Sequence, residues 1–207
     1  MLRRGSPRSV REVADLLSAW NGFYVMIGSS AAALTGLMFV VITLARTEDS
    51  TASEAGVSVF STPTVVHFSC ALFTAALMTA PFRSFAPIEI VLGLVGAAGM
   101  FHVARTAVLT SRLETYQPDL DDWIWHVLLP FVAYATYVAG AIALHAAPAG
   151  AFYATATAVT LLIFIGIHNA WDVVTFLATG KAERLPDKPS AGEQVPVAAG
   201  NPALSED

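Results

Sequence analysis

The 207-residue chain contains few charged residues, a single cysteine and no established metal-binding motif. Asp, Glu, Lys and Arg make up 13% of its residues, compared with roughly a quarter in ordinary soluble domains. The lone Cys70 excludes a disulfide within the chain. Because no basic patch is interleaved with aromatic residues, nucleic acid is not expected as a partner. No stretch outside the apolar segments is long enough to form a soluble domain.

Long apolar segments dominate the chain instead, and 55% of its residues are hydrophobic. Five of these segments are long enough to cross about 30 Å of hydrocarbon as helices that rise about 1.5 Å per residue. The sequence therefore predicts an all-α, multi-pass membrane protein built as a bundle of five transmembrane helices. The predicted spans are residues 23–45, 63–82, 87–109, 123–146 and 150–177.

Two further regions flank this predicted domain of residues 23–180. Residues 1–22 carry four arginines and an apolar stripe at helical spacing, which is typical of a short amphipathic helix in the membrane interface. Packing of the same stripe against the bundle is an equally good explanation. We expect this helix to end at Asn21 and Gly22. Residues 181–207 are rich in proline and in small and charged residues, and we expect a disordered tail. The apolar stripe within residues 1–22 consists of Val13, Leu16, Leu17 and Trp20.

Small residues recur at helix-packing spacing in three of the predicted spans. Such residues let helices approach closely inside a membrane, where no hydrophobic effect draws them together. They favour contacts within one bundle, although a face for a second copy or for another membrane protein has the same pattern. The residues are Gly28, Ala32 and Gly36, then Gly93, Gly96, Ala97 and Gly99, and finally Ala135, Ala139 and Ala143.

Four of the five histidines lie on four different predicted spans, at His67, His102, His126 and His168. Since successive spans run in opposite directions, all four are expected within roughly 4–14 Å of the same membrane surface. His145 falls at the opposite face. Histidine is rare inside membranes and costly there unless it has a partner. The sequence therefore predicts a one-sided polar layer in which at least three histidines converge on one cavity.

His168 and Asp172 are four residues apart and share one face of a helix. We expect both to face the bundle interior, where the carboxylate orients the imidazole. We also expect Arg105 to pair with Asp172, directly or through water, because either charge alone is costly in hydrocarbon.

This polar layer is a candidate site for haem b or a transition metal. The candidate metal ligands are His67, His102, His126, His168 and Asp172, and haem would be bound through His102 and His168. No spacing such as His-Glu-x-x-His or Cys-x-x-Cys identifies a particular metal. No catalytic residue is assigned, and an enzymatic role is not favoured.

Three functions remain open from the sequence. We favour a non-catalytic membrane subunit or scaffold whose histidines form a structural polar network. The second is a histidine-ligated haem or metal site for electron transfer or metal handling. The third is proton or small-ion conduction, with His168 and Asp172 as relay groups.

The expected surroundings of the chain follow from its surface chemistry. The lipid bilayer is the expected partner, together with a second copy or a membrane-complex partner at the small-residue faces. Four arginines precede the first span, which favours a cytoplasmic N-terminus. The compact loops favour a bacterial inner membrane as the location.

Overall fold

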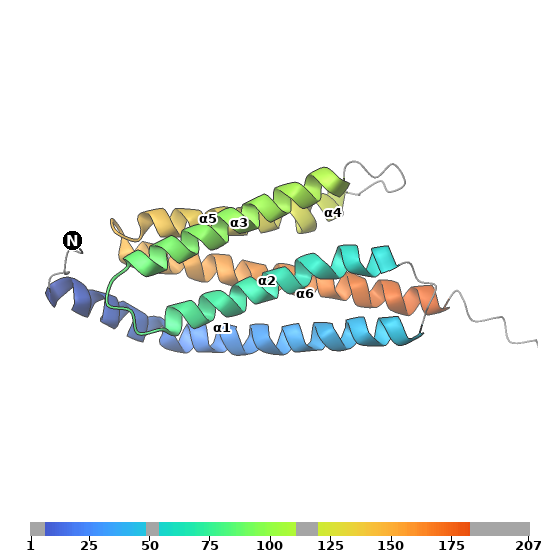
Figure 1. The fold of residues 1–207 in the computed structure, drawn as a ribbon, viewed down its shortest axis with the longest axis horizontal. Helices are drawn as coiled ribbons and strands as arrows, with labels where there is room; N and C mark the ends of the chain where they lie inside the picture. Colours follow the sequence, from blue (N-terminus) through green and yellow to red (C-terminus); the bar gives the residue numbers. More distant parts are fainter. Residues whose placement is uncertain (1–6, 49–53, 111–119, 183–207) are drawn as a thin grey trace, which may run out of the picture.

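Helices form all the regular structure in the part of the chain that the computed structural model describes, residues 7–48, 54–110 and 120–182. They lie side by side along one long axis (Figure 1). The all-α bundle predicted from the sequence is confirmed. The expected disordered tail lies almost wholly outside the described residues. In chain order the helices are α1 (Pro7–Glu48), α2 (Glu54–Thr79), α3 (Ala86–Thr110), α4 (Leu120–Trp123), the π-helix η1 (Ile124–Leu128), α5 (Leu129–Ala143) and α6 (Pro148–Ala182).

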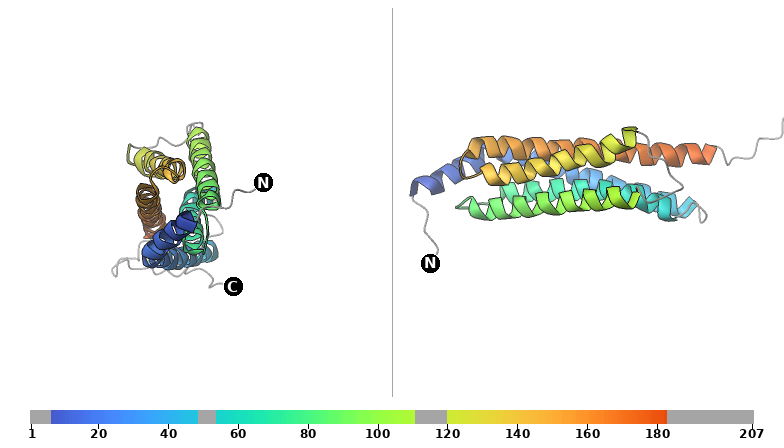
Figure 2. Two further views of the ribbon diagram at one scale, coloured as in Figure 1. Left: turned by 90° about the vertical axis from the view of Figure 1, so that its left-hand side faces the viewer. Right: turned by 90° about the horizontal axis from the view of Figure 1, so that it is seen from above.

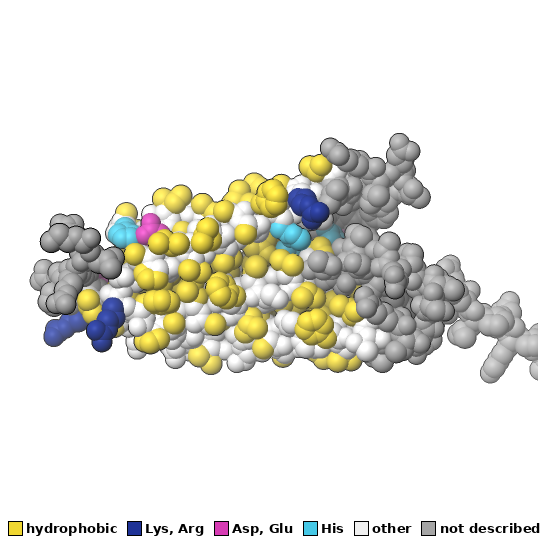
Figure 3. Space-filling model, viewed as in Figure 1, with side chains coloured by type: hydrophobic (Ala, Val, Ile, Leu, Met, Phe, Trp, Pro, Cys, Tyr) yellow, Lys and Arg dark blue, Asp and Glu magenta, His cyan; other side chains and the backbone are white. Residues whose placement is uncertain are grey.

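Within the residues that the structure describes, four stretches of helix are long and apolar enough to cross a membrane, and they lie in α1, α3, η1 with α5, and α6. The remaining helix of the bundle, α2, contributes a shorter apolar stretch at Pro63–Thr79. Large apolar side chains point outward, as in Phe101 with 72% and Ile142 with 75% of the surface exposed. On the face drawn in Figure 3, hydrophobic side chains cover the middle of the molecule, and the charged ones lie toward its ends. This distribution is that of a membrane-embedded bundle.

The first helix is longer than the sequence predicts. α1 continues through Asn21 and Gly22 without interruption, so the expected helix end at these residues is wrong. The physical reason is packing: Val13 and Leu17 are buried before this point and Tyr24 is buried after it, on the same side of the helix. Burial along a continuous stripe outweighs the roughly 1 kcal/mol by which glycine disfavours a helix. Figure 1 shows the N-terminal part of α1 lying at an angle to the rest.

The helices pack in a fixed order around the bundle. α1 packs on α2, α2 on α6, α6 on α5, and α5 on α3. Seen along the long axis, they form a closely packed bundle (Figure 2). Within the described residues, α3 makes no extensive contact with α6.

Three close approaches between helices depend on glycine. A Cβ at Gly96 of α3 would overlap the Val138 side chain and the carbonyl oxygen of Tyr134 on α5. A Cβ at Gly99 of α3 would overlap the Tyr134 ring of α5. A Cβ at Gly166 of α6 would overlap the Phe68 ring of α2. By contrast, a Cβ at Gly36 of α1 would meet nothing within 4 Å. Two of the expected small-residue positions therefore differ sharply: Gly99 packs inside the bundle and Gly36 faces outward.

Candidate functional site

The best-defined polar contact of the core joins α2 to α5. His67 is buried, and its Nδ1 lies 2.9 Å from the hydroxyl oxygen of Tyr134. That hydroxyl donates to Sγ of Cys70, one turn away on α2, at 3.6 Å. When Tyr134 donates to the sulfur, the His67 Nδ1 must carry the proton and donate to the Tyr134 oxygen. The three groups form one hydrogen-bonded chain between α2 and α5, two helices that are not packed directly on each other in the part of the chain that the structure describes.

Two further histidines lie near the hydrogen-bonded chain of His67, Tyr134 and Cys70. His67 is close enough to His102 of α3 and to His126 of η1 to interact with both electrostatically. Nε2 of His102 is buried and has no hydrogen-bond partner within the described part of the chain. His126 lies on the π-helical turn that leads into α5, and such turns occur frequently at functional sites. Side chains from three helices therefore approach one another at this end of the bundle.

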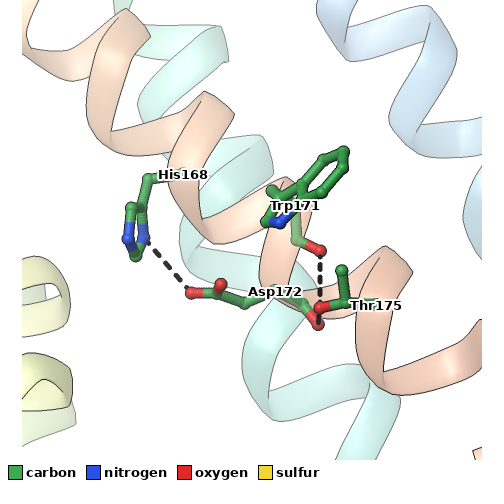
Figure 4. A network of polar contacts seen from close by, with 4 residues as sticks. All are labelled: His168, Trp171, Asp172 and Thr175. Atoms are coloured by element: carbon green, nitrogen blue, oxygen red, sulfur yellow. Dashed lines mark hydrogen bonds and ion pairs between the residues drawn. The ribbon is translucent and has the colours of Figure 1, made fainter. Parts of the chain in front are cut away.

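His168 reaches the same end of the bundle from α6. Its ring stacks face to face on Trp125 of η1, with the centroids 3.8 Å apart and the planes inclined by 6°. Nδ1 of His168 lies 3.2 Å from Oδ2 of Asp172 (Figure 4). This is an ion-pair distance, although the angle is not that of a hydrogen bond. The side chains are 29% and 48% exposed, so the expectation that Asp172 faces the bundle interior is wrong.

Arg105 does not meet Asp172. Its side chain is exposed, and it has no ion-pair partner among the residues that the structure describes. The direct Arg105–Asp172 pair expected from the sequence is therefore wrong. The reason is that both side chains are exposed, and that they lie on α3 and α6, two helices that make no extensive contact.

A second polar group lies deeper in the core, and sequence reasoning missed most of it. Tyr24 of α1, Thr74 of α2 and Tyr137 of α5 are each 0% exposed. None of the three hydroxyls makes a hydrogen bond of good geometry within the described ranges. The Tyr137 and Thr74 hydroxyls nevertheless lie within hydrogen-bonding reach of each other, and Tyr24 and Cys70 lie near Tyr137. A buried hydroxyl without a partner costs about 1–3 kcal/mol, so this arrangement calls for an explanation.

One pattern in the sequence could have predicted part of this group of buried polar side chains. Tyr134 and Tyr137 are three residues apart in an otherwise apolar span, which places both hydroxyls on one helix face. A tyrosine inside a bundle needs a partner for its O–H. Asn169 gives a similar signal on α6: it is 1% exposed, and neither amide atom has a partner in the described structure.

His145 lies at the opposite end of the bundle, as the sequence predicts. Its Nδ1 is 2.9 Å from Oε2 of Glu89, and the two side chains are 64% and 37% exposed. The pair connects the end of α5 to the start of α3. Exposed pairs of this kind contribute little to stability.

We expect Asp172→Asn to change the free energy of unfolding by less than about 1 kcal/mol, because the His168–Asp172 pair is partly exposed and exposed pairs contribute little. Thermal unfolding of the purified protein in detergent measures the change. Glu89→Gln, which removes the exposed pair at the other end, is the matched control and should behave alike. A loss of several kcal/mol in Asp172→Asn alone would contradict the exposed placement of this carboxylate.

The described residues contain no group of three or more His, Cys, Asp or Glu side chains that could hold a metal ion. A metal at His67, His102, His126, His168 and Asp172 therefore stays a prediction without geometric support, as does a haem between His102 and His168. Comparison of the chain with models of protein families, with curated proteins and with solved structures finds no match.

Proposed function

We propose that the chain is a non-catalytic membrane subunit or scaffold whose buried polar groups fix the arrangement of its helices. The observation that carries this proposal is the His67–Tyr134–Cys70 chain, which joins α2 to α5 inside an apolar core. Hydrogen bonds between membrane helices contribute up to about 1–2 kcal/mol each. They also disfavour rotated or shifted arrangements, because those would leave polar atoms unpaired.

The proposed surroundings are a cell inner membrane with the N-terminus in the cytoplasm. The arginines before the first span support this orientation. The bilayer is the immediate partner of the exposed apolar side chains. Gly36 supports a contact with a second copy or a membrane-complex partner, because its face of α1 is open.

His67→Leu tests the structural role. The substitution keeps an apolar side chain of similar size but leaves the Tyr134 hydroxyl without its imidazole partner. We expect the free energy of unfolding to fall by about 1–3 kcal/mol. The absorption spectrum and the metal content of the purified protein should be the same as in the wild type. His145→Leu is the control, and its stability should hardly change because His145 is exposed.

Two outcomes would contradict the proposal. A Soret band or a stoichiometric metal in the wild-type protein that is lost in His67→Leu would identify a cofactor site instead. Equal stability of the wild type and His67→Leu would show that the buried chain does not hold the helices together.

A further inference from the structure

We propose that the bundle core contains a proton-transfer path made of hydroxyl, thiol and imidazole groups. This activity goes beyond a scaffold role, and its central relay groups are not the exposed His168 and Asp172. The path uses side chains from three helices, and all of them except the partly buried Cys70 are fully enclosed. Its members, in order along the bundle, are Tyr24, Thr74, Tyr137, Cys70, Tyr134 and His67.

The helical spacing places these groups in two facing rows. On α2, His67, Cys70 and Thr74 occupy one face at steps of three and four residues, and they span about 10 Å along the helix axis. On α5, Tyr134 and Tyr137 are one turn apart. Tyr134 contacts both His67 and Cys70, and Tyr137 lies near Cys70, Thr74 and Tyr24. Two links of the path are therefore hydrogen bonds, from His67 to Tyr134 and from Tyr134 to Cys70, and the proposal extends the path from Cys70 to the neighbouring Tyr137, Thr74 and Tyr24.

Both ends of the path lead toward the ends of the bundle. At the N-terminal end, a cavity of about 430 Å³ lies between α1 and the α2–α3 connection, and its walls include Ser18, Asn21 and Thr79. Asn21 is one turn from Tyr24 on the same face of α1. At the other end, His67 is near His102 and His126. Beyond them, the partly exposed His168 stacks on the neighbour of His126, Trp125.

The buried hydroxyls of Tyr24, Thr74 and Tyr137 provide the second line of evidence. Thr74 and Tyr137 lie within hydrogen-bonding reach of each other, and none of the three hydroxyls has a well-aligned partner in the described structure. The path as proposed includes a water among these hydroxyls, because a buried water takes two to four polar partners. Such a water would connect Tyr24 to the Tyr137–Cys70 part of the path. Fully buried hydroxyls on three different helices are otherwise an unexplained cost.

The hydrogen bonds that join His67, Tyr134 and Cys70 can run in either of two directions. Proton transfer along them converts the first direction into the second. In the first, Nδ1–H of His67 donates to Tyr134, and Tyr134 donates to Cys70. When a proton binds to Nε2 of His67, the proton on Nδ1 passes to Tyr134, so that His67 gains one proton and loses one. The hydroxyl proton of Tyr134 passes to Cys70, and the thiol proton passes on toward Tyr137. Each group has then gained and lost one proton, and His67 carries its proton on Nε2. Rotation of the hydroxyl and thiol groups, together with reorientation of the His67 ring so that an N–H again faces Tyr134, restores the first direction.

Proton flux into liposomes tests the path. The full chain is reconstituted into vesicles that contain a pH-sensitive dye, and a potassium gradient with valinomycin provides the driving potential. We expect wild-type vesicles to acidify faster than protein-free vesicles. Tyr134→Phe should lower the flux to the protein-free level, because a phenyl ring has no exchangeable proton. Tyr153→Phe is the control and should match the wild type, since Tyr153 is 66% exposed on the outside of α6.

Two variants at Cys70 test the proton path even if the Tyr134→Phe protein is not stable. Cys70→Ser keeps an exchangeable proton and should conduct, whereas Cys70→Ala removes it and should not. Circular dichroism and gel filtration establish that both variants are folded. The proposal is overturned by wild-type flux equal to that of protein-free vesicles, or by equal conduction in Cys70→Ser and Cys70→Ala. A comparable flux of sodium ions through the wild type would also overturn it, because it would show a general leak.

Discussion

Gly99→Ala should push α3 away from α5 and lower the free energy of unfolding by on the order of 1–3 kcal/mol. The added methyl group would overlap the Tyr134 ring near its attachment to the backbone, where the ring cannot swing aside. The intrinsic preference of alanine over glycine in a helix, about 1 kcal/mol, works in the opposite direction. Thermal unfolding in detergent measures the net effect.

Gly36→Ala is the matched control for this substitution. It makes the same chemical change in a helix, but the new methyl group meets nothing within 4 Å. Its stability should equal or exceed that of the wild type. Tyr134→Leu should make Gly99→Ala less harmful, because a smaller side chain leaves room for the methyl group. Equal stability of Gly99→Ala and Gly36→Ala would show that α3 and α5 are farther apart than described.

Gly166→Ala should be comparably harmful at the α2–α6 interface, again by on the order of 1–3 kcal/mol. Here the new Cβ would overlap the ring of Phe68, which is fully buried. Because Phe68 is the immediate neighbour of His67, the displaced α2 would also strain the hydrogen bond from His67 to Tyr134.

A double-mutant cycle with Phe68→Leu separates the local overlap from general destabilisation. The two substitutions should couple, so that the double variant is more stable than the sum of the single losses predicts. Additive losses would mean that Gly166 and Phe68 do not share a contact. Unfolding curves for the four proteins in the same detergent provide the comparison.

The sequence predicts the fold well because the fold depends on patterns within each segment. The third predicted span, residues 87–109, differs by one residue at each end from α3 (Ala86–Thr110). The continuity of α1 through Gly22 could not be predicted in this way. It depends on the surface against which Val13, Leu17 and Tyr24 pack, and a local pattern contains no information about that surface.

The site was predicted less well, since it depends on which helices become neighbours. Alternation of the spans assigns His67, His102 and His126 to one end, and His102 and His126 both lie near His67. The same reasoning could not show that α3 and α6 are not packed together, and the expected Arg105–Asp172 pair is wrong for that reason. Gly36 and Gly99 illustrate the same limit, because both belong to small-residue patterns and only one packs inside the bundle.

The unbroken α1 determines how far the core of the bundle extends. Its 42 residues correspond to about 60 Å of helix, roughly twice the thickness of the hydrocarbon layer. Even when tilted, such a helix extends beyond the hydrocarbon. The part that extends is the N-terminal one, which lies at an angle to the rest (Figure 1). Because it carries the buried Val13 and Leu17, the bundle core continues into this extension.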